Sequence, residues 1–140
     1  MLHGATRAIG DMTRYIVDAF AWVEYLAATP LGARVRGIVE GEENDIFTAA
    51  LSVSEIVSRA QREGRDGRRA ADLLEGVSVI VSMDFTLAVS TGVIHAERRR
   101  EIRDFPYGDA AILATARRLK AKVLTEDSHF QGMENVEFLA

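Results

Sequence analysis

Two hydrophobic periods alternate along the chain, and they predict strands and helices in turn. Short apolar runs rich in β-branched residues predict strands at 14–18, 45–48, 77–81, 122–125 and 136–138. Apolar residues at three- and four-residue spacing predict helices at 19–26, 30–40, 52–63, 67–74, 85–97 and 109–119. Strands that alternate with helices favour an α/β fold. We expect a single three-layer α/β/α domain with a mostly parallel sheet of about five strands.

Polar residues at several helix starts match the chemistry of helix caps. Ser52 is followed three residues later by Glu55, a capping box that predicts a helix beginning at Ser52. Asp84 is a favourable N-cap for the following helix. Asp109 stands in the first turn of the 109–119 helix, where the helix dipole favours an acid. These signals predict where three of the helices start.

The predicted elements fill one domain, residues 13–140, and we expect residues 1–12 to form a loose leader. The leader lacks the continuous apolar segment and the cleavage site of a signal peptide. No apolar run approaches the roughly 20 residues of a membrane helix, so we expect no membrane contact. The chain has no cysteine, which excludes disulfides, thiolate metal sites and thiol catalysis. A cytoplasmic location is the expectation.

Four acids lie at the ends of predicted strands or at the starts of neighbouring helices. Asp18 closes the first strand, and Glu55 lies in the first turn of the helix after the second strand. Asp109 opens the helix before the fourth strand, and Asp127 follows that strand. Ligands of an open α/β sheet bind beyond the carboxyl ends of its strands. We therefore expect the fold to gather these four side chains at one edge of the sheet.

Each acid also has a purely structural interpretation as a cap or a dipole partner. Together, however, four neighbouring carboxylates would raise one another's pKa values unless a cation neutralised them. Oxygen ligands select a hard ion such as Mg²⁺ or Mn²⁺, and such a site suits hydrolysis of phosphodiesters. In this hypothesis Asp18 and Asp109 are the central metal ligands and Asp127 is an additional one. Glu55 is either a ligand or the base that orients the attacking water.

Four segments resemble the PIN-domain nucleases, and most closely the VapC-type toxins of prokaryotic toxin–antitoxin pairs. The segments are Tyr15-Ile-Val-Asp18 with Trp22 and Glu24, Ser54-Glu55, the helix Asp109-Ala-Ala-Ile-Leu-Ala-Thr-Ala116, and Leu124-Thr-Glu-Asp-Ser-His-Phe130. The resemblance covers Met12 to Ala140. It implies a Mg²⁺- or Mn²⁺-dependent endoribonuclease that forms a homodimer and is inhibited by a small antitoxin protein. It also implies that Thr125 supports Asp127 by hydrogen bonding.

One position departs from the family pattern. The family commonly has Thr or Ser directly after the first acid and then a polar residue, whereas Ala19 and Phe20 follow Asp18 here. A hydroxyl beside the metal is therefore absent from this segment. All four acids remain.

Basic residues gather at 59–62, 65–69 and 98–103, where they can line an RNA path, contact an acidic partner or form solvated helix faces. Arg59 and Arg62 are the candidates for substrate binding, although Arg59 can instead pair with Glu55 on the same helix face. His129 adjoins Asp127, but we expect it to be a surface turn residue. No phosphate-binding loop, dinucleotide fingerprint or serine nucleophile elbow is present in the sequence.

The net charge of −4 argues against a protein that coats nucleic acid by bulk charge. Two divalent ions at the four acids would leave the remaining surface nearly neutral. RNA binding is then expected to depend on divalent metal as well as on salt. Two alternatives stay open: a PIN nuclease of RNA processing or quality control, and a non-catalytic PIN-like module for binding or dimerisation.

Overall fold

The computed structural model describes residues 12–139, so the predicted leader lies almost wholly outside the described residues. Five strands form one sheet in the order β3-β2-β1-β4-β5, and every neighbouring pair is parallel. They are β1 (Thr13–Val17), β2 (Asn44–Ala49), β3 (Val79–Val81), β4 (Lys122–Thr125) and β5 (Val136–Phe138). The predicted five-stranded parallel sheet is confirmed.

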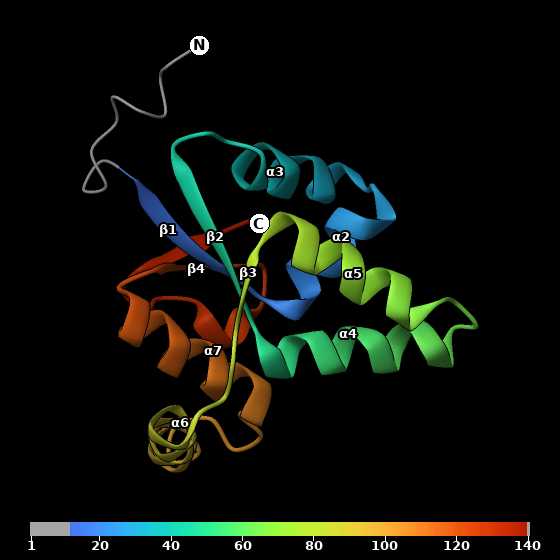
Figure 1. Ribbon diagram of the computed structural model, residues 1–140. Helices are drawn as coiled ribbons and strands as arrows, with labels where there is room; N and C mark the ends of the chain where they lie inside the picture. Colours follow the sequence, from blue (N-terminus) through green and yellow to red (C-terminus); the bar gives the residue numbers. More distant parts are fainter. Residues whose placement is uncertain (1–11, 140) are drawn as a thin grey trace.

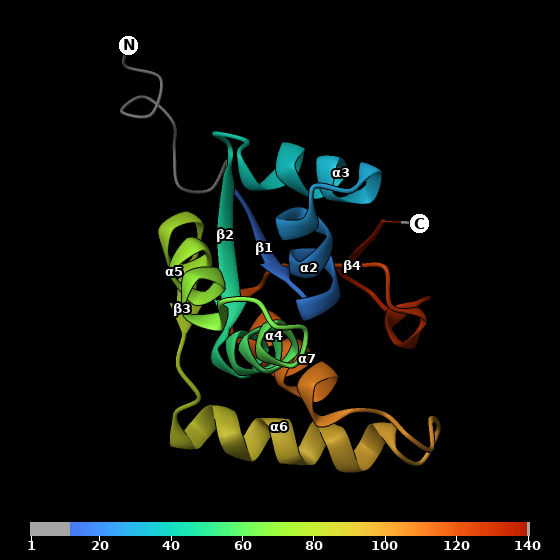
Figure 2. The ribbon, with the colours of Figure 1, turned by 90° about the vertical axis from the view of Figure 1, so that its right-hand side faces the viewer.

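Helices cover both faces of the sheet, which makes the three layers visible in Figures 1 and 2. On one face lie α2 (Ala19–Ala27), α3 (Pro30–Val39), α4 (Ala50–Arg62) and α5 (Gly67–Val77). On the other lie α6 (Phe85–Arg98) and α7 (Tyr107–Leu119). A short 3₁₀ turn, η2 (Ser128–Phe130), follows β4. The predicted α/β/α architecture is therefore correct.

The central strands are buried on both faces, and successive side chains serve opposite cores. Ile16 and Val123 pack in the core under α6 and α7, whereas Val17 and Leu124 pack in the core under α2 to α5. This follows from the two-residue period of a strand. It also explains why the sequences of these strands are continuous apolar runs, as is usual in parallel sheets.

The chain changes direction in the sheet between β1 and β4. From β1 the chain adds β2 and then β3 on one side, and it returns to add β4 and β5 on the other side. The backbone N–H of Asp18 donates to the carbonyl of Leu124 at 3.1 Å, so the carboxyl ends of β1 and β4 lie side by side. Such a switch point is where open α/β sheets bind ligands.

Three predicted starts are wrong. The helix expected from Asp109 begins two residues earlier, at Tyr107. The helix expected to begin at Ser52 begins at Ala50, and its N-cap Ala49 makes no side-chain cap bond, so there is no capping box. Ser52 is buried inside the helix, because this turn of α4 packs against the core. The strand expected from Val77 begins at Val79, because α5 continues to Val77.

Other boundaries agree with the prediction. Asp84 caps α6, with its carboxylate accepting the N–H of Leu87 at 2.8 Å. Between residues 12 and 139, no helix is long and apolar enough to cross a membrane.

Candidate active site

Asp18 stands where β1 ends and α2 begins, and it is only 3% exposed. One carboxylate oxygen accepts the N–H of Ala21 at 2.7 Å, which makes Asp18 the N-cap of α2. The other oxygen accepts the hydroxyl of Thr125. Burial raises the pKa of Asp18 to about 6, even though both hydrogen bonds lower it. The carboxylate is thus held rigidly in a place where its charge is poorly compensated.

Thr125 joins the ends of the two central strands. It is fully buried as the last residue of β4. Its hydroxyl donates to Asp18 and accepts the backbone N–H of Asp127 at 2.8 Å. Thr125 therefore supports Asp127 through its backbone N–H, whereas the carboxylate that Thr125 binds is that of Asp18. This one side chain sets the position of both acids relative to each other.

Asp109, Asp127 and His129 form a compact cluster. Nδ1 of His129 lies 3.0 Å from a carboxylate oxygen of Asp109 and 3.1 Å from one of Asp127. One ligand atom from each residue lies within 4.8 Å of the other two. The three side chains come from the first turn of α7 and from the turn after β4, so the fold alone brings them together.

His129 lies in a turn and is 32% exposed, but it also contacts two of the acids, which the sequence did not predict. Asp127 caps η2 by accepting the backbone N–H of His129 at 2.9 Å. That turn carries the imidazole back over Asp109. The only sequence signal was its position two residues after Asp127. Histidine in a turn is too common for that spacing to have indicated a site.

In the cluster, two carboxylates share one imidazole. Burial raises the pKa of Asp109 to about 7, and the charge of Asp127 adds to this, whereas the hydrogen bond with His129 opposes it. Desolvation lowers the pKa of His129, but its hydrogen bond with Asp109 and the nearby carboxylate charges outweigh desolvation and raise it. The carboxylate oxygens of Asp109 and Asp127 are ligands that suit Mn²⁺ or Mg²⁺, whereas an imidazole nitrogen suits softer transition metals. The donor set therefore fits a divalent cation.

Glu55 lies against Gly108, the residue before Asp109. A Cβ on Gly108 would lie 2.8 Å from Oε1 of Glu55 and 2.9 Å from Oε2, closer than real contacts allow. The missing side chain lets the carboxylate of Glu55, from α4, lie against the first turn of α7 beside Asp109. Burial raises the pKa of Glu55. Gly108 is thus a site residue that sequence reasoning missed.

Arg59 and Arg62 continue along α4 beyond Glu55. Nε of Arg59 donates to Glu63 at 3.1 Å, and its guanidinium lies 5.8 Å from the centre of the Phe20 ring. Arg59 therefore pairs with Glu63 and not with Glu55. Arg62 is exposed near the end of the helix. The two arginines flank the acids and form no part of the cluster itself.

The chain belongs to the PIN-domain family, since the family model described as PIN domain matches residues 15–136. This confirms the resemblance found in the sequence. No curated protein matches with significance.

Solved structures with the same fold include two toxin–antitoxin complexes. One, from Klebsiella pneumoniae, has a TM-score of 0.70 at 16% identity, and the match covers 90% of this chain and 98% of that one. The VapBC2 complex from Rickettsia felis, bound to a DNA fragment from its promoter, has a TM-score of 0.72 at 13% identity, covering 90% and 97%. VapC20 from Mycobacterium tuberculosis, described as a toxin that cleaves the sarcin–ricin loop, has a TM-score of 0.65 at 18% identity, covering 88% and 97%. At these identities the likeness is one of fold.

Proposed function

We propose that this protein is a Mg²⁺- or Mn²⁺-dependent endoribonuclease and the toxin of a toxin–antitoxin pair, acting in the cytoplasm. The observation that carries the proposal is the cluster of Asp109, Asp127 and His129 beside Asp18 at the switch point of a PIN fold, with the carboxylate of Glu55 against Gly108. The structural likeness to VapC20, a toxin described by the RNA loop that it cleaves, supports RNA as the substrate.

Asp18, Asp109 and Asp127 would hold the metal. A divalent ion in such a site, when bound, stabilises the negative charge of the phosphodiester and makes a water molecule more acidic. The chain holds two of these carboxylates in place by hydrogen bonds: Ala21 and Thr125 orient Asp18, and Thr125 fixes the backbone of Asp127. Pre-organised carboxylates of this kind lose little freedom when they bind a cation and its substrate.

Glu55 is the general base in this proposal. Its raised pKa, caused by burial, makes its carboxylate a better proton acceptor near neutral pH. It takes a proton from the water whose oxygen bonds to phosphorus, and the ester bond to the departing oxygen then breaks. The departing oxygen takes a proton from solvent. Gly108 keeps Glu55 close enough to the other acids for this role.

A small antitoxin protein is the proposed partner. The likeness to the toxin–antitoxin complexes supports this. A groove of about 200 Å³ between α2, α4 and α5 offers a docking site, with apolar residues, three arginines and the acids Glu63 and Asp66 in its lining. Leu26, Ile56 and Leu73 contribute apolar surface, and Leu73 is 48% exposed. This lining suits an apolar segment that also carries acidic side chains.

A homodimer is the proposed assembly. Phe85, Val89 and Val93 recur every four residues along α6, and they are 84%, 52% and 52% exposed. Such a stripe on one helix face is unusual for a monomer's surface and suits contact with a second copy. Val79 on the neighbouring edge strand β3 is also exposed and extends the apolar surface.

The decisive experiment measures RNA cleavage by the protein and by Asp109→Asn with Mn²⁺ and with EDTA. We expect cleavage by the protein with metal only and no cleavage by the variant, with unchanged circular dichroism. Full activity of the variant would contradict the proposal. An RNA-processing nuclease would show the same dependence, and the identity of the RNA cut in cells distinguishes the two roles.

Metal binding distinguishes our proposal from a non-catalytic module. Under our proposal Mn²⁺ raises the midpoint of thermal unfolding, and Asp18→Asn removes this rise. A non-catalytic module would show no metal effect in either protein.

A further inference from the structure

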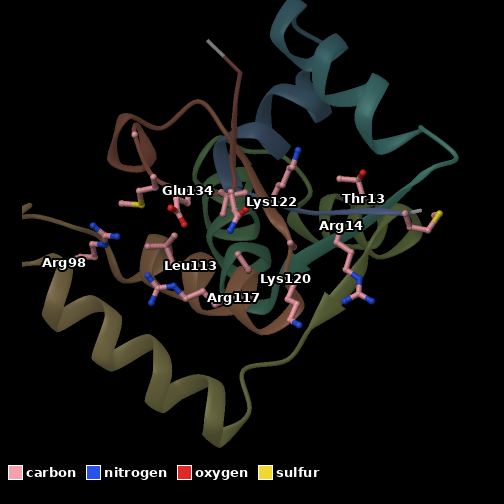
Figure 3. A pocket seen from close by; sticks show the side chains of 15 residues that line it. Thr13, Arg14, Arg98, Leu113, Arg117, Lys120, Lys122 and Glu134 are labelled. Atoms are coloured by element: carbon pink, nitrogen blue, oxygen red, sulfur yellow. The ribbon is translucent and has the colours of Figure 1, made fainter. Parts of the chain in front are cut away.

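A second, basic site lies at the opposite end of the sheet from the acids. A cavity of about 1160 Å³ opens at the amino ends of β1 and β4, beside the end of α7 (Figure 3). Its floor is apolar and includes Leu113, Ala116 and Val123. Five cationic side chains and only one acid, Glu134, also line it. We call it the basic cavity, and its cations are Arg14, Arg98, Arg117, Lys120 and Lys122.

Most of these cations lack an anionic partner. Arg117, Lys120 and Lys122 form no ion pair with any residue between 12 and 139, and Arg98 lies 3.5 Å from exposed Glu101. Arg14 uses one N–H to bind the carbonyl of Leu119 at 2.9 Å. Figure 3 shows Lys120 and Lys122 pointing in opposite directions, so the cations surround the cavity from several sides, and together they attract an anion with several charges. The charge of this surface is positive, whereas the net charge of the whole chain is −4.

Basic residues lie between the acids and the basic cavity. The ring of Phe105 lies 5.8 Å from the ring of His129 in the acid cluster. Phe105 also lines a smaller hollow with Arg99 and Arg103. Arg98, the neighbour of Arg99 in sequence, lines the basic cavity. One ligand that extends from the acids can therefore follow these arginines to the basic cavity.

The distance between the acid cluster and the basic cavity suits a nucleic acid strand that contacts both. Asp109 and Lys120 mark the two ends of α7, and eleven residues of helix span about 16 Å. At about 3.4 Å per nucleotide along a helical strand, this corresponds to roughly five nucleotides. The apolar floor can contact bases or riboses while the cations contact phosphates.

We propose that the basic cavity is an exosite for the phosphodiester backbone of the RNA substrate, roughly five nucleotides from the bond that is cut. The inference rests on the proposed function and adds the path of the substrate. RNA is favoured over an acidic protein segment because Arg99 and Arg103 lie between the acid cluster and the basic cavity.

The test removes three charges and keeps polar side chains with part of the aliphatic stem, in Arg117→Gln/Lys120→Gln/Lys122→Gln. The control removes three arginines outside the basic cavity and outside the segments 59–69 and 98–103, in Arg34→Gln/Arg36→Gln/Arg118→Gln. Both are compared with the protein on RNAs of about 4 and about 20 nucleotides, of which only the longer spans the two sites.

For the longer RNA we expect the cavity variant to bind about tenfold more weakly or worse and to raise KM at unchanged kcat. The slope of log K against log salt should fall by about 2, since each single-strand phosphate contact contributes about 0.7. The short RNA should be bound and cut as before, and the control variant should match the protein. An equal effect on both RNAs, or an unchanged slope, would overturn the exosite.

Lysine acetylation gives a readout that does not need catalysis. Lys120 and Lys122 are the only two lysines in the chain, and both line the basic cavity. In Asp109→Asn, the longer RNA should protect both from acetylation and the short RNA neither. Protection by poly-aspartate but not by RNA would assign the cavity to an acidic protein segment and overturn the proposal. If no RNA is cut by the unaltered protein, the proposed function fails, and the lysine result still decides the exosite.

Discussion

The starts of α2 and α6 use the same local chemistry in opposite surroundings. Asp18 and Asp84 both cap a helix, each accepting a backbone N–H three residues later. Asp84 is exposed and also binds the guanidinium of Arg118 at 2.8 and 2.9 Å, and this bond lowers the pKa of Asp84 to about 2. Asp18 is buried without a cation, and burial raises its pKa to about 6. A cap with a partner is structural, whereas a buried cap without one is available to a ligand.

The largest effect is expected from exchanging each of these two acids for its amide. Asp18→Asn should lower the rate of RNA cleavage with Mn²⁺ at least 100-fold, because a metal carboxylate is lost while the amide oxygen can still cap α2. Asp84→Asn should leave the rate unchanged. The rates are measured on the same RNA at saturating Mn²⁺. Equal rates for both variants would show that Asp18 is only a cap.

Alanine substitutions at two glycines compare a position in the candidate site with a position outside it. Gly108→Ala places a methyl group against the carboxylate of Glu55, which is the flexible end of a side chain and can move away. We expect cleavage to fall about 10- to 100-fold as the base is displaced. Thermal unfolding should stay unchanged or rise slightly, since alanine favours a helix.

Gly92→Ala on α6 is the matched control, because nothing lies within 4 Å of the added Cβ. It should give the same small rise in stability with full activity. A fall in cleavage by both variants would argue against a specific role of Gly108.

The pH dependence of stability should have opposite signs at the two caps. The pKa of Asp18 is raised in the folded protein, so the folded state binds a proton more tightly than the unfolded state does. Without metal, the free energy of unfolding should fall by about 3 kcal/mol as pH rises from about 4 to about 6. Asp18→Asn should remove this part of the fall. Urea unfolding with EDTA at several pH values measures it.

Asp84 should give the smallest effect, at lower pH. Its pKa is lowered in the folded protein, so its stabilising contribution is complete above about pH 4 and is lost as pH falls toward 2. Solvent screens the exposed pair with Arg118, so the change is expected to be slight. Arg118→Gln should flatten the curve in this range. An unchanged curve would mean that the pair contributes nothing measurable.

The sequence supported the fold further than it supported the site. The strand at 122–125 and the strand at 136–138 were predicted at their observed bounds, because each is a short β-branched run between breaks. The start of α4 was missed because Ala49 and Ala50 carry no capping side chain to mark it. Gly108 was missed since a glycine at a helix start has many possible causes.

The sequence by itself determined the alternation of strands and helices, the four acids at strand ends and the PIN family. These depend on local periodicity and on motifs that each lie within a short segment. Only the tertiary structure decided which acids lack a counter-charge, because burial and pairing depend on residues far away in the chain. It placed Thr125 between Asp18 and Asp127, turned His129 onto Asp109 and gathered five cations at the other end of the sheet. The pKa of an acid depends on its burial and on the charges beside it, and packing determines both.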